Sequence, residues 1–217
     1  MLKKICIKSA VICFSTIIIM MYTMPQISAE TMQPEQSSYN SDFGLRCGMR
    51  KLWIDHTFWT KSYIVSALEN LPDKEKVLAR LLKNQKDIGN AIKPYYGEAA
   101  GDELTKLLTE HILIAGKIVD AAQKGEQGNL KALDAEWHRN ADEIAEFLSK
   151  ANPYWSYANL KNLLYIHLKF VADQAVTRLK KDYDAEIEAF DEGEDHILKL
   201  ADALSEGIIK QFPQKFK

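Results

Sequence analysis

Apolar side chains recur every three or four residues from about residue 45 to the end of the chain, without the strict alternation that indicates strands. This spacing predicts an all-α protein built from amphipathic helices. The pattern and its breaks place the helices at about 45–70, 73–94, 98–124, 130–152, 156–181 and 184–211. Because the connections are short, neighbouring helices should run antiparallel. We therefore predict an up-and-down antiparallel bundle of five to six helices with a four-helix-bundle-like core.

Residues that favour helix ends define most of these boundaries. The side chain of Asp73 is expected to cap the second helix, and Pro94 is expected to break it. Gly125 and Gly128 should end the third helix. The join between the last two helices is less marked, because no Gly or Pro interrupts the sequence around it. One unbroken helix would be about 80 Å long, so we favour a break near 181–184, with a single long helix as the alternative.

Each predicted helix carries one apolar stripe that should face the core. Positions assigned to these stripes include Leu45, Met49, Leu81, Ile92, Leu104, Trp137, Ile144, Leu160, Leu179, Ile187, Ile197 and Leu204.

The first 29 residues have the layout of a secretory signal peptide. Lys3, Lys4 and Lys8 precede an apolar run over 10–24, and the small residue Ala29 precedes the expected cleavage point. The run is shorter than the roughly 20 residues that a spanning helix needs. We predict export, with an uncleaved anchor that keeps the protein near a membrane as the alternative.

The remaining chain divides into a polar segment over 30–42, expected to be a flexible tether, and a helical-bundle domain over 43–217. The whole chain has 28 Lys and Arg against 30 Asp and Glu. A mildly acidic domain without a basic stripe argues against nucleic-acid binding. Of three cysteines only Cys47 lies beyond the leader, so an internal disulfide is excluded. A packed thiol is expected at this position rather than a disulfide between chains.

Four histidines lie at nearly the same height in the predicted bundle, each eleven to thirteen residues from a predicted helix end. They are His56, His111, His167 and His196. If the helices alternate in direction, these ends share one side of the molecule, and the rings form a polar layer roughly 16–20 Å above it. Asp87 is a candidate carboxylate ligand near the same level.

Two interpretations of this layer are open. Imidazole nitrogens with a nearby carboxylate suit a first-row transition metal, and such a layer also suits a small polar ligand. Buried histidines also form structural layers in which carbonyl, amide or water partners satisfy the ring nitrogens. No helix shows the Glu-x-x-His signature of di-iron bundles, and no other cofactor is predicted. His138 stands among polar residues and is expected to have no role.

Two loops rich in aromatic residues should lie at the end of the bundle from which the tether leaves. One carries Tyr95 and Tyr96, and the other carries Tyr154, Trp155 and Tyr157. Exposed aromatic rings bind partners or rest on a membrane interface. The alternative is that these rings close the end of the core.

Familiar catalytic arrangements are absent from the sequence. It contains no Gly-x-Ser-x-Gly elbow, no Gly-rich phosphate loop after a strand and no Cys-x-x-Cys-His haem motif. We therefore predict a non-enzymatic protein that acts by binding or structure at the cell envelope, through an unidentified partner or small ligand. Transition-metal or small-ligand binding in the histidine layer is the alternative.

Several segments resemble a known family. They are NQKDIGNAIKPYYGEAAGDELTKLLTEHILIA (84–115), ADALSEGIIKQFP (201–213), the surroundings of Trp59, the segment from Trp137 to Asn140, and Ala151 to Pro153. Together they resemble a family of small, signal-bearing, all-helical bacterial proteins whose biochemical function is unassigned. The likeness covers nearly the whole domain after the leader. It implies export and a helical fold, and it carries over no catalytic residue.

Overall fold

Six α-helices contain most of the residues that the computed structural model describes, which are 41–216. They are α1 (Asp42–Leu68), α2 (Lys74–Tyr96), α3 (Glu98–Lys124), α4 (Gln127–Ala151), α5 (Tyr157–Leu179) and α6 (Tyr183–Gln211), followed by the short 3-10 helix η2 (Pro213–Phe216). No strand occurs within this range. The predicted leader and nearly all of the predicted tether lie outside it.

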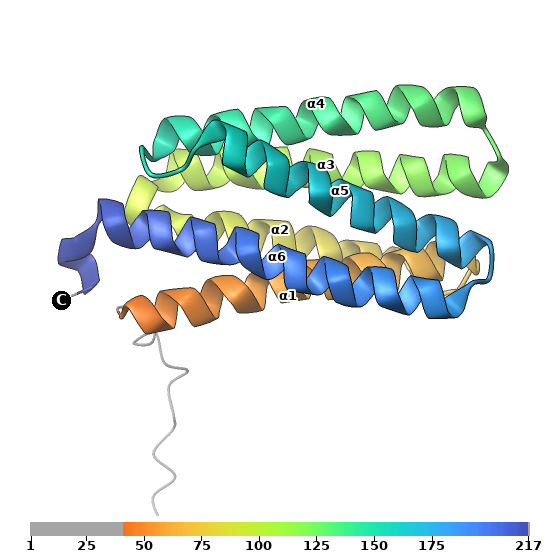
Figure 1. Ribbon diagram of the computed structural model, residues 1–217, viewed down its shortest axis with the longest axis horizontal. Helices are drawn as coiled ribbons and strands as arrows, with labels where there is room; N and C mark the ends of the chain where they lie inside the picture. Colours follow the sequence, from red (N-terminus) through yellow and green to blue (C-terminus); the bar gives the residue numbers. More distant parts are fainter. Residues whose placement is uncertain (1–40, 217) are drawn as a thin grey trace, which may run out of the picture. The chain divides into compact units, whose positions relative to one another are not determined.

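The helices form an up-and-down bundle in which each packs against the next, and α6 packs back against α1 (Figure 1). Helix α1 also contacts α3 and α5, so it lies toward the centre of the bundle. Because direction alternates along the chain, α1, α3 and α5 run the same way. The predicted all-α antiparallel bundle is confirmed, with six α-helices between residues 41 and 216.

Local chemistry explains several helix ends. The hydroxyl of Ser41 accepts a hydrogen bond from the backbone N–H of Gly44 at the start of α1. Gly125, at φ 71°, follows α3 in the left-handed conformation that glycine adopts most easily. The predicted break between the last two helices is confirmed, because Lys181 has φ 59° and α6 begins two residues later.

Three boundary predictions were wrong. Helix α2 continues through Pro94 to Tyr96. The proline removes the N–H that would have bonded the carbonyl oxygen of Asn90, but the helix ends two residues later, so only its last turn is affected. Asp73 precedes α2, but its side chain makes no capping hydrogen bond, since its own backbone is already helical. Gly128 lies in the first turn of α4, because Gly125 alone reverses the chain.

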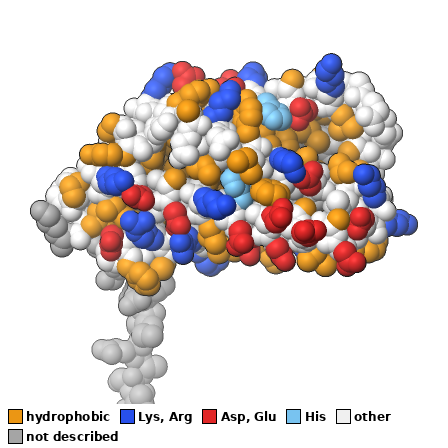
Figure 2. Space-filling view, in the orientation of Figure 1, with side chains coloured by type: hydrophobic (Ala, Val, Ile, Leu, Met, Phe, Trp, Pro, Cys, Tyr) orange, Lys and Arg blue, Asp and Glu red, His pale blue; other side chains and the backbone are white. Residues whose placement is uncertain are grey.

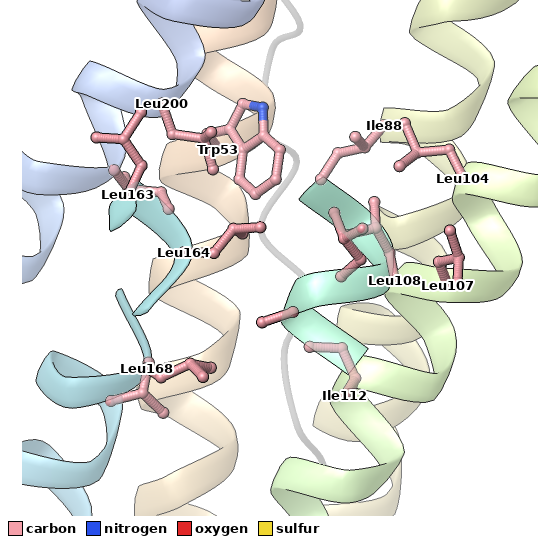
Figure 3. Close-up of a cluster of buried hydrophobic side chains, with 14 of the residues drawn as sticks. Trp53, Ile88, Leu104, Leu107, Leu108, Ile112, Leu163, Leu164, Leu168 and Leu200 are labelled. Carbon is pink, nitrogen blue, oxygen red and sulfur yellow. The ribbon is translucent and has the colours of Figure 1, made fainter. Parts of the chain in front are cut away.

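A leucine-rich core fills the space between the helices. Figure 3 shows Trp53 of α1 between leucines of α5 and α6 on one side and apolar side chains of α2 and α3 on the other. The labelled side chains are Trp53, Ile88, Leu104, Leu107, Leu108, Ile112, Leu163, Leu164, Leu168 and Leu200. All ten are buried. Burial of this apolar surface stabilises the bundle and fixes the depth of any polar side chain on the same helix faces.

The surface corrects three further predictions. Cys47 is exposed, because it follows the buried Leu45 by two residues and so lies off the inner face of α1. Leu179 and Ile187 are also exposed, since they flank the turn between α5 and α6, where the helices reach solvent.

Acidic side chains gather over the first half of α6 (Figure 2). None of the helices between residues 41 and 216 is long and apolar enough to cross a bilayer.

Candidate functional site

The four histidines predicted to face the core are all buried. His56, His111 and His167 are 2–3% exposed, and His196 is 5% exposed. The first three lie near the middle of α1, α3 and α5, the helices that run in the same direction. We call these three residues the imidazole cluster.

Two members of the imidazole cluster are in direct contact. Nε2 of His56 lies 3.3 Å from Nε2 of His167, and the two ring centroids are 5.2 Å apart. The same contact joins α1 to α5 across the core. At this distance the two nitrogens share one proton in a hydrogen bond, so one ring must present a lone pair to the other.

The third member is held by an amide. His111 Nδ1 lies 2.8 Å from Oδ1 of Asn140 on α4, and Nδ2 of Asn140 donates to the carbonyl oxygen of Leu107 at 3.1 Å. The second hydrogen bond fixes the orientation of the amide, so its oxygen faces the ring. His111 therefore donates from Nδ1, and its Nε2 carries a free lone pair.

His56 has a similar neighbour on α2. His56 Nδ1 and Gln85 Oε1 are both buried, and neither has a partner at hydrogen-bonding distance. Gln85 nevertheless raises the pKa of His56. An oxygen that accepts a hydrogen bond from a ring N–H has this effect, because it stabilises the protonated ring. Gln85 Nε2 is occupied by the carbonyl oxygen of Leu81 at 2.8 Å. We infer that Nδ1 of His56 carries the hydrogen and that its Nε2 carries the lone pair.

Rings continue on both sides of the contact and form a row across the core. His111 stacks on His167 with centroids 6.2 Å apart and planes 23° apart. Trp53 lies 5.5 Å from the His56 ring, and Trp137 lies 5.3 Å from the His111 ring. The indole N–H groups of both tryptophans are buried without a hydrogen-bond partner. No protein group pairs with these two donors, which distinguishes them from most buried N–H groups.

Burial keeps the imidazole cluster uncharged. It lowers the pKa of His56 to about 3 and that of His111 to about 4, and it lowers the pKa of His167 well below its usual value. The charged forms of neighbouring histidines lower the pKa of His56 and of His167 further. At neutral pH the cluster therefore consists of neutral rings, which are the form that binds metal ions.

Two predicted members of the layer lie elsewhere. His196 donates from Nε2 to the carbonyl oxygen of Leu163 at 2.8 Å, in the gap between α5 and α6. Asp87 lies on the outer side of α2 and pairs with Lys83 at 2.8 Å, because the two residues are one helical turn apart. Of the candidate residues, the structure therefore places His196 and Asp87 apart from the imidazole cluster.

Gln85 and the two indoles were not predicted as part of the site, whereas Asn140 was expected at the same level as the histidines. Gln85 stands one turn from Leu81 and three residues before Ile88, so it occupies a position in the apolar stripe of α2. That polar residue in an apolar stripe is the signal that identifies it. Asn140 lies between Trp137 and Ala141 in the same way.

The number of converging donors is small. Within residues 41–216, no three His, Cys, Asp or Glu side chains are placed to hold one metal ion. The preformed pair is His56 with His167, and His111 is the next ring in the row. His138, by contrast, lies at the surface, with Nδ1 2.9 Å from the carbonyl oxygen of Asp134.

The aromatic loops mostly close the end of the core. Tyr96 donates from its hydroxyl to Oε1 of Gln211 at 2.8 Å, and Trp155, 4% exposed, donates from Nε1 to the carbonyl oxygen of Ala203. The partly buried ring of Tyr95 stacks on Phe216. Tyr154 and Tyr157 are 57% and 41% exposed, so these two remain accessible at this end of the bundle.

No protein-family model matches the chain, and neither the curated proteins nor the solved structures contain a significant match. The resemblance drawn from the sequence therefore stays a prediction.

Proposed function

We propose that this is an exported, non-enzymatic binding protein, and that the imidazole cluster is its binding site for a transition-metal ion. The observation that carries the proposal is the 3.3 Å separation of His56 Nε2 and His167 Nε2. Two imidazole nitrogens on one ion, with bonds of 2.0–2.1 Å and tetrahedral or trigonal angles, lie about 3.3–3.6 Å apart. The pair therefore has the spacing of two ligands before any ion binds.

The partners of the rings support the proposal. Histidines that bind metals usually donate their other ring N–H to an oxygen, which fixes the tautomer and orients the ring. Asn140 does this for His111, and the Gln85 carboxamide is the side chain that acts on His56 by raising its pKa. Both amides are completely buried, so they act on the rings and not on solvent.

A purely structural polar layer is the competing explanation. Such a layer stabilises a fold when every member is satisfied, and a partly satisfied one costs stability. His56 Nδ1, Gln85 Oε1 and the two indole N–H groups lack partners. An ion bound at Nε2 of His56 and His167 would leave these four groups unchanged, so they do not decide between the two explanations. The spacing of the two Nε2 atoms is why we favour a site.

Export is supported by the leader sequence alone. An envelope partner is a second proposal, and the exposed rings of Tyr154 and Tyr157 are the surface that favours it. The metal proposal rests on the more specific geometry, the spacing of two imidazole nitrogens.

Metal binding can be tested with His167→Phe, which removes both ring nitrogens but keeps an aromatic ring in the core. The chain is purified without a histidine tag and with Cys47→Ser throughout, because Cys47 is an exposed thiol. It is then dialysed against copper or zinc, and bound metal is counted by mass spectrometry. We expect about one ion per chain and a higher melting temperature, since an ion that binds only the folded state stabilises it.

The matched control is His138→Gln, which removes a surface histidine that touches none of the cluster. It should retain the ion and the gain in melting temperature, whereas a folded His167→Phe should lose both. Gln85→Leu should weaken binding by about 10- to 100-fold, as is typical for residues that orient metal ligands. Absence of bound metal in the parent chain, or equal binding in His167→Phe, would contradict the proposal.

A further inference from the structure

We infer that the ion held by the imidazole cluster is monovalent copper, Cu(I), and not a divalent ion. The inference rests on the proposed function and concerns the charge of the ion and the number of its ligands. It follows from three features of the core: few donors, no compensating charge and an apolar surround.

The number of donors favours an ion of low coordination number. His56 and His167 are the preformed pair, and the free Nε2 of His111 belongs to the adjacent stacked ring. Two or three nitrogens complete the coordination of a monovalent d10 ion. Structural zinc takes four protein ligands, and octahedral ions take six. The described part of the chain does not place even three ligand side chains together.

The charge of the donors also favours a monovalent ion. All three rings are neutral, and no carboxylate accompanies them. Among the described residues the one buried carboxylate is Glu186, in the first turn of α6, where it accepts a hydrogen bond from Arg178 at 3.1 Å. Asp87 pairs with Lys83 at the surface. An ion in the imidazole cluster would therefore keep its full charge.

The apolar side chains around the imidazole cluster make it unfavourable to bury that charge. Leu108 and Leu164 stand one helical turn before His111 and His167, and each is 2% exposed. The free energy of moving an ion from water into such a medium rises with the square of its charge. For a divalent ion it is about four times that of a monovalent ion of the same size. Neutral ligands in an apolar core thus select the lower charge.

The test compares Cu(I), Cu(II) and Zn(II) on the same chain. The Cys47→Ser protein is titrated with Cu(I) under anaerobic conditions against a Cu(I) chelator, and with Cu(II) and Zn(II) against chelators for divalent ions. X-ray absorption at the copper edge then reports the oxidation state and the number of nitrogen ligands. We expect one Cu(I) with two or three nitrogens, and affinities for Cu(II) and Zn(II) at least about 100-fold lower.

The outcomes separate this inference from the proposed function. Cu(I) binding that is lost in His56→Phe and His167→Phe, but kept in His138→Gln, supports both. Zn(II) or Cu(II) binding of equal strength that is lost in the same variants overturns the inference and leaves the metal proposal standing. No binding of any of the three ions overturns both. Cu(I) binding that survives both phenylalanine substitutions places copper elsewhere and also overturns both.

Discussion

Lowering the pH from 7 to about 4 is expected to destabilise the fold by on the order of 5 kcal/mol, because it protonates the unfolded chain at histidines that the folded chain keeps neutral. The pKa of His56 is about 3 and that of His111 about 4 in the fold, against an ordinary value of 6.5. Their contribution to stability is therefore complete above pH 6.5. It is lost progressively as the pH falls toward 4. A loss of this size is comparable to the whole stability of many domains.

Urea unfolding at pH 7, 6, 5 and 4.5 measures this effect. His111→Phe should flatten the pH dependence, because it removes one of the groups whose protonation differs between the two states. His138→Gln should not change it, since that side chain lies at the surface. A free energy of unfolding that is constant within about 1 kcal/mol from pH 7 to 4.5 would show that the buried rings are not held neutral.

Gly89→Ala in α2 is expected to destabilise the bundle by about 3 kcal/mol, although alanine normally stabilises a helix relative to glycine. A Cβ at Gly89 would collide with the carbonyl oxygen of Gly101 and with the hydroxyl of Thr105 on α3. The contact is reciprocal, since a Cβ at Gly101 would lie 2.7 Å from the carbonyl oxygen of Gly89. Backbone cannot yield as a flexible side chain does, so α2 and α3 must separate.

The control for this prediction is Gly128→Ala, also within a helix. A Cβ there meets no atom within 4 Å, so only the helix propensity should act, and the protein should gain up to about 1 kcal/mol. The two variants are compared by thermal and urea unfolding. If Gly89→Ala is as stable as the parent chain, the close approach of α2 and α3 is not a feature of the protein in solution.

Helix positions followed from the sequence because long apolar stripes of helical spacing are the strongest local signal. The break between α5 and α6 was also predicted, although no Gly or Pro marks it, because an unbroken helix would be much longer than the helices it packs against. The misplaced ends have a common cause. Pro94 and Gly128 lie in the terminal turns of helices, where a proline removes a single helical hydrogen bond and a glycine weakens only the helix end.

The candidate site was predicted less completely than the fold. Burial of the histidines was readable from their apolar neighbours one turn away on each helix. Their pairing was not, because it depends on the rotation and stagger of helices relative to one another, which periodicity does not determine. His196 illustrates this limit, since it is buried at a similar level but bonds to Leu163 in another gap. The sequence could have shown that Asp87 lies outside the site, because Lys83 stands one turn before it and the two side chains pair at the surface.

The central claim is that the core holds neutral imidazoles and that His56 and His111 present Nε2 lone pairs to an ion. Nitrogen-15 NMR of the histidine side chains at pH 7, without metal, tests it most directly because it distinguishes the two neutral tautomers from the charged ring. We expect His56 and His111 to be neutral with the hydrogen on Nδ1, and to stay neutral down to about pH 5. A hydrogen on Nε2 of both rings, or charged rings at pH 6, would contradict the claim.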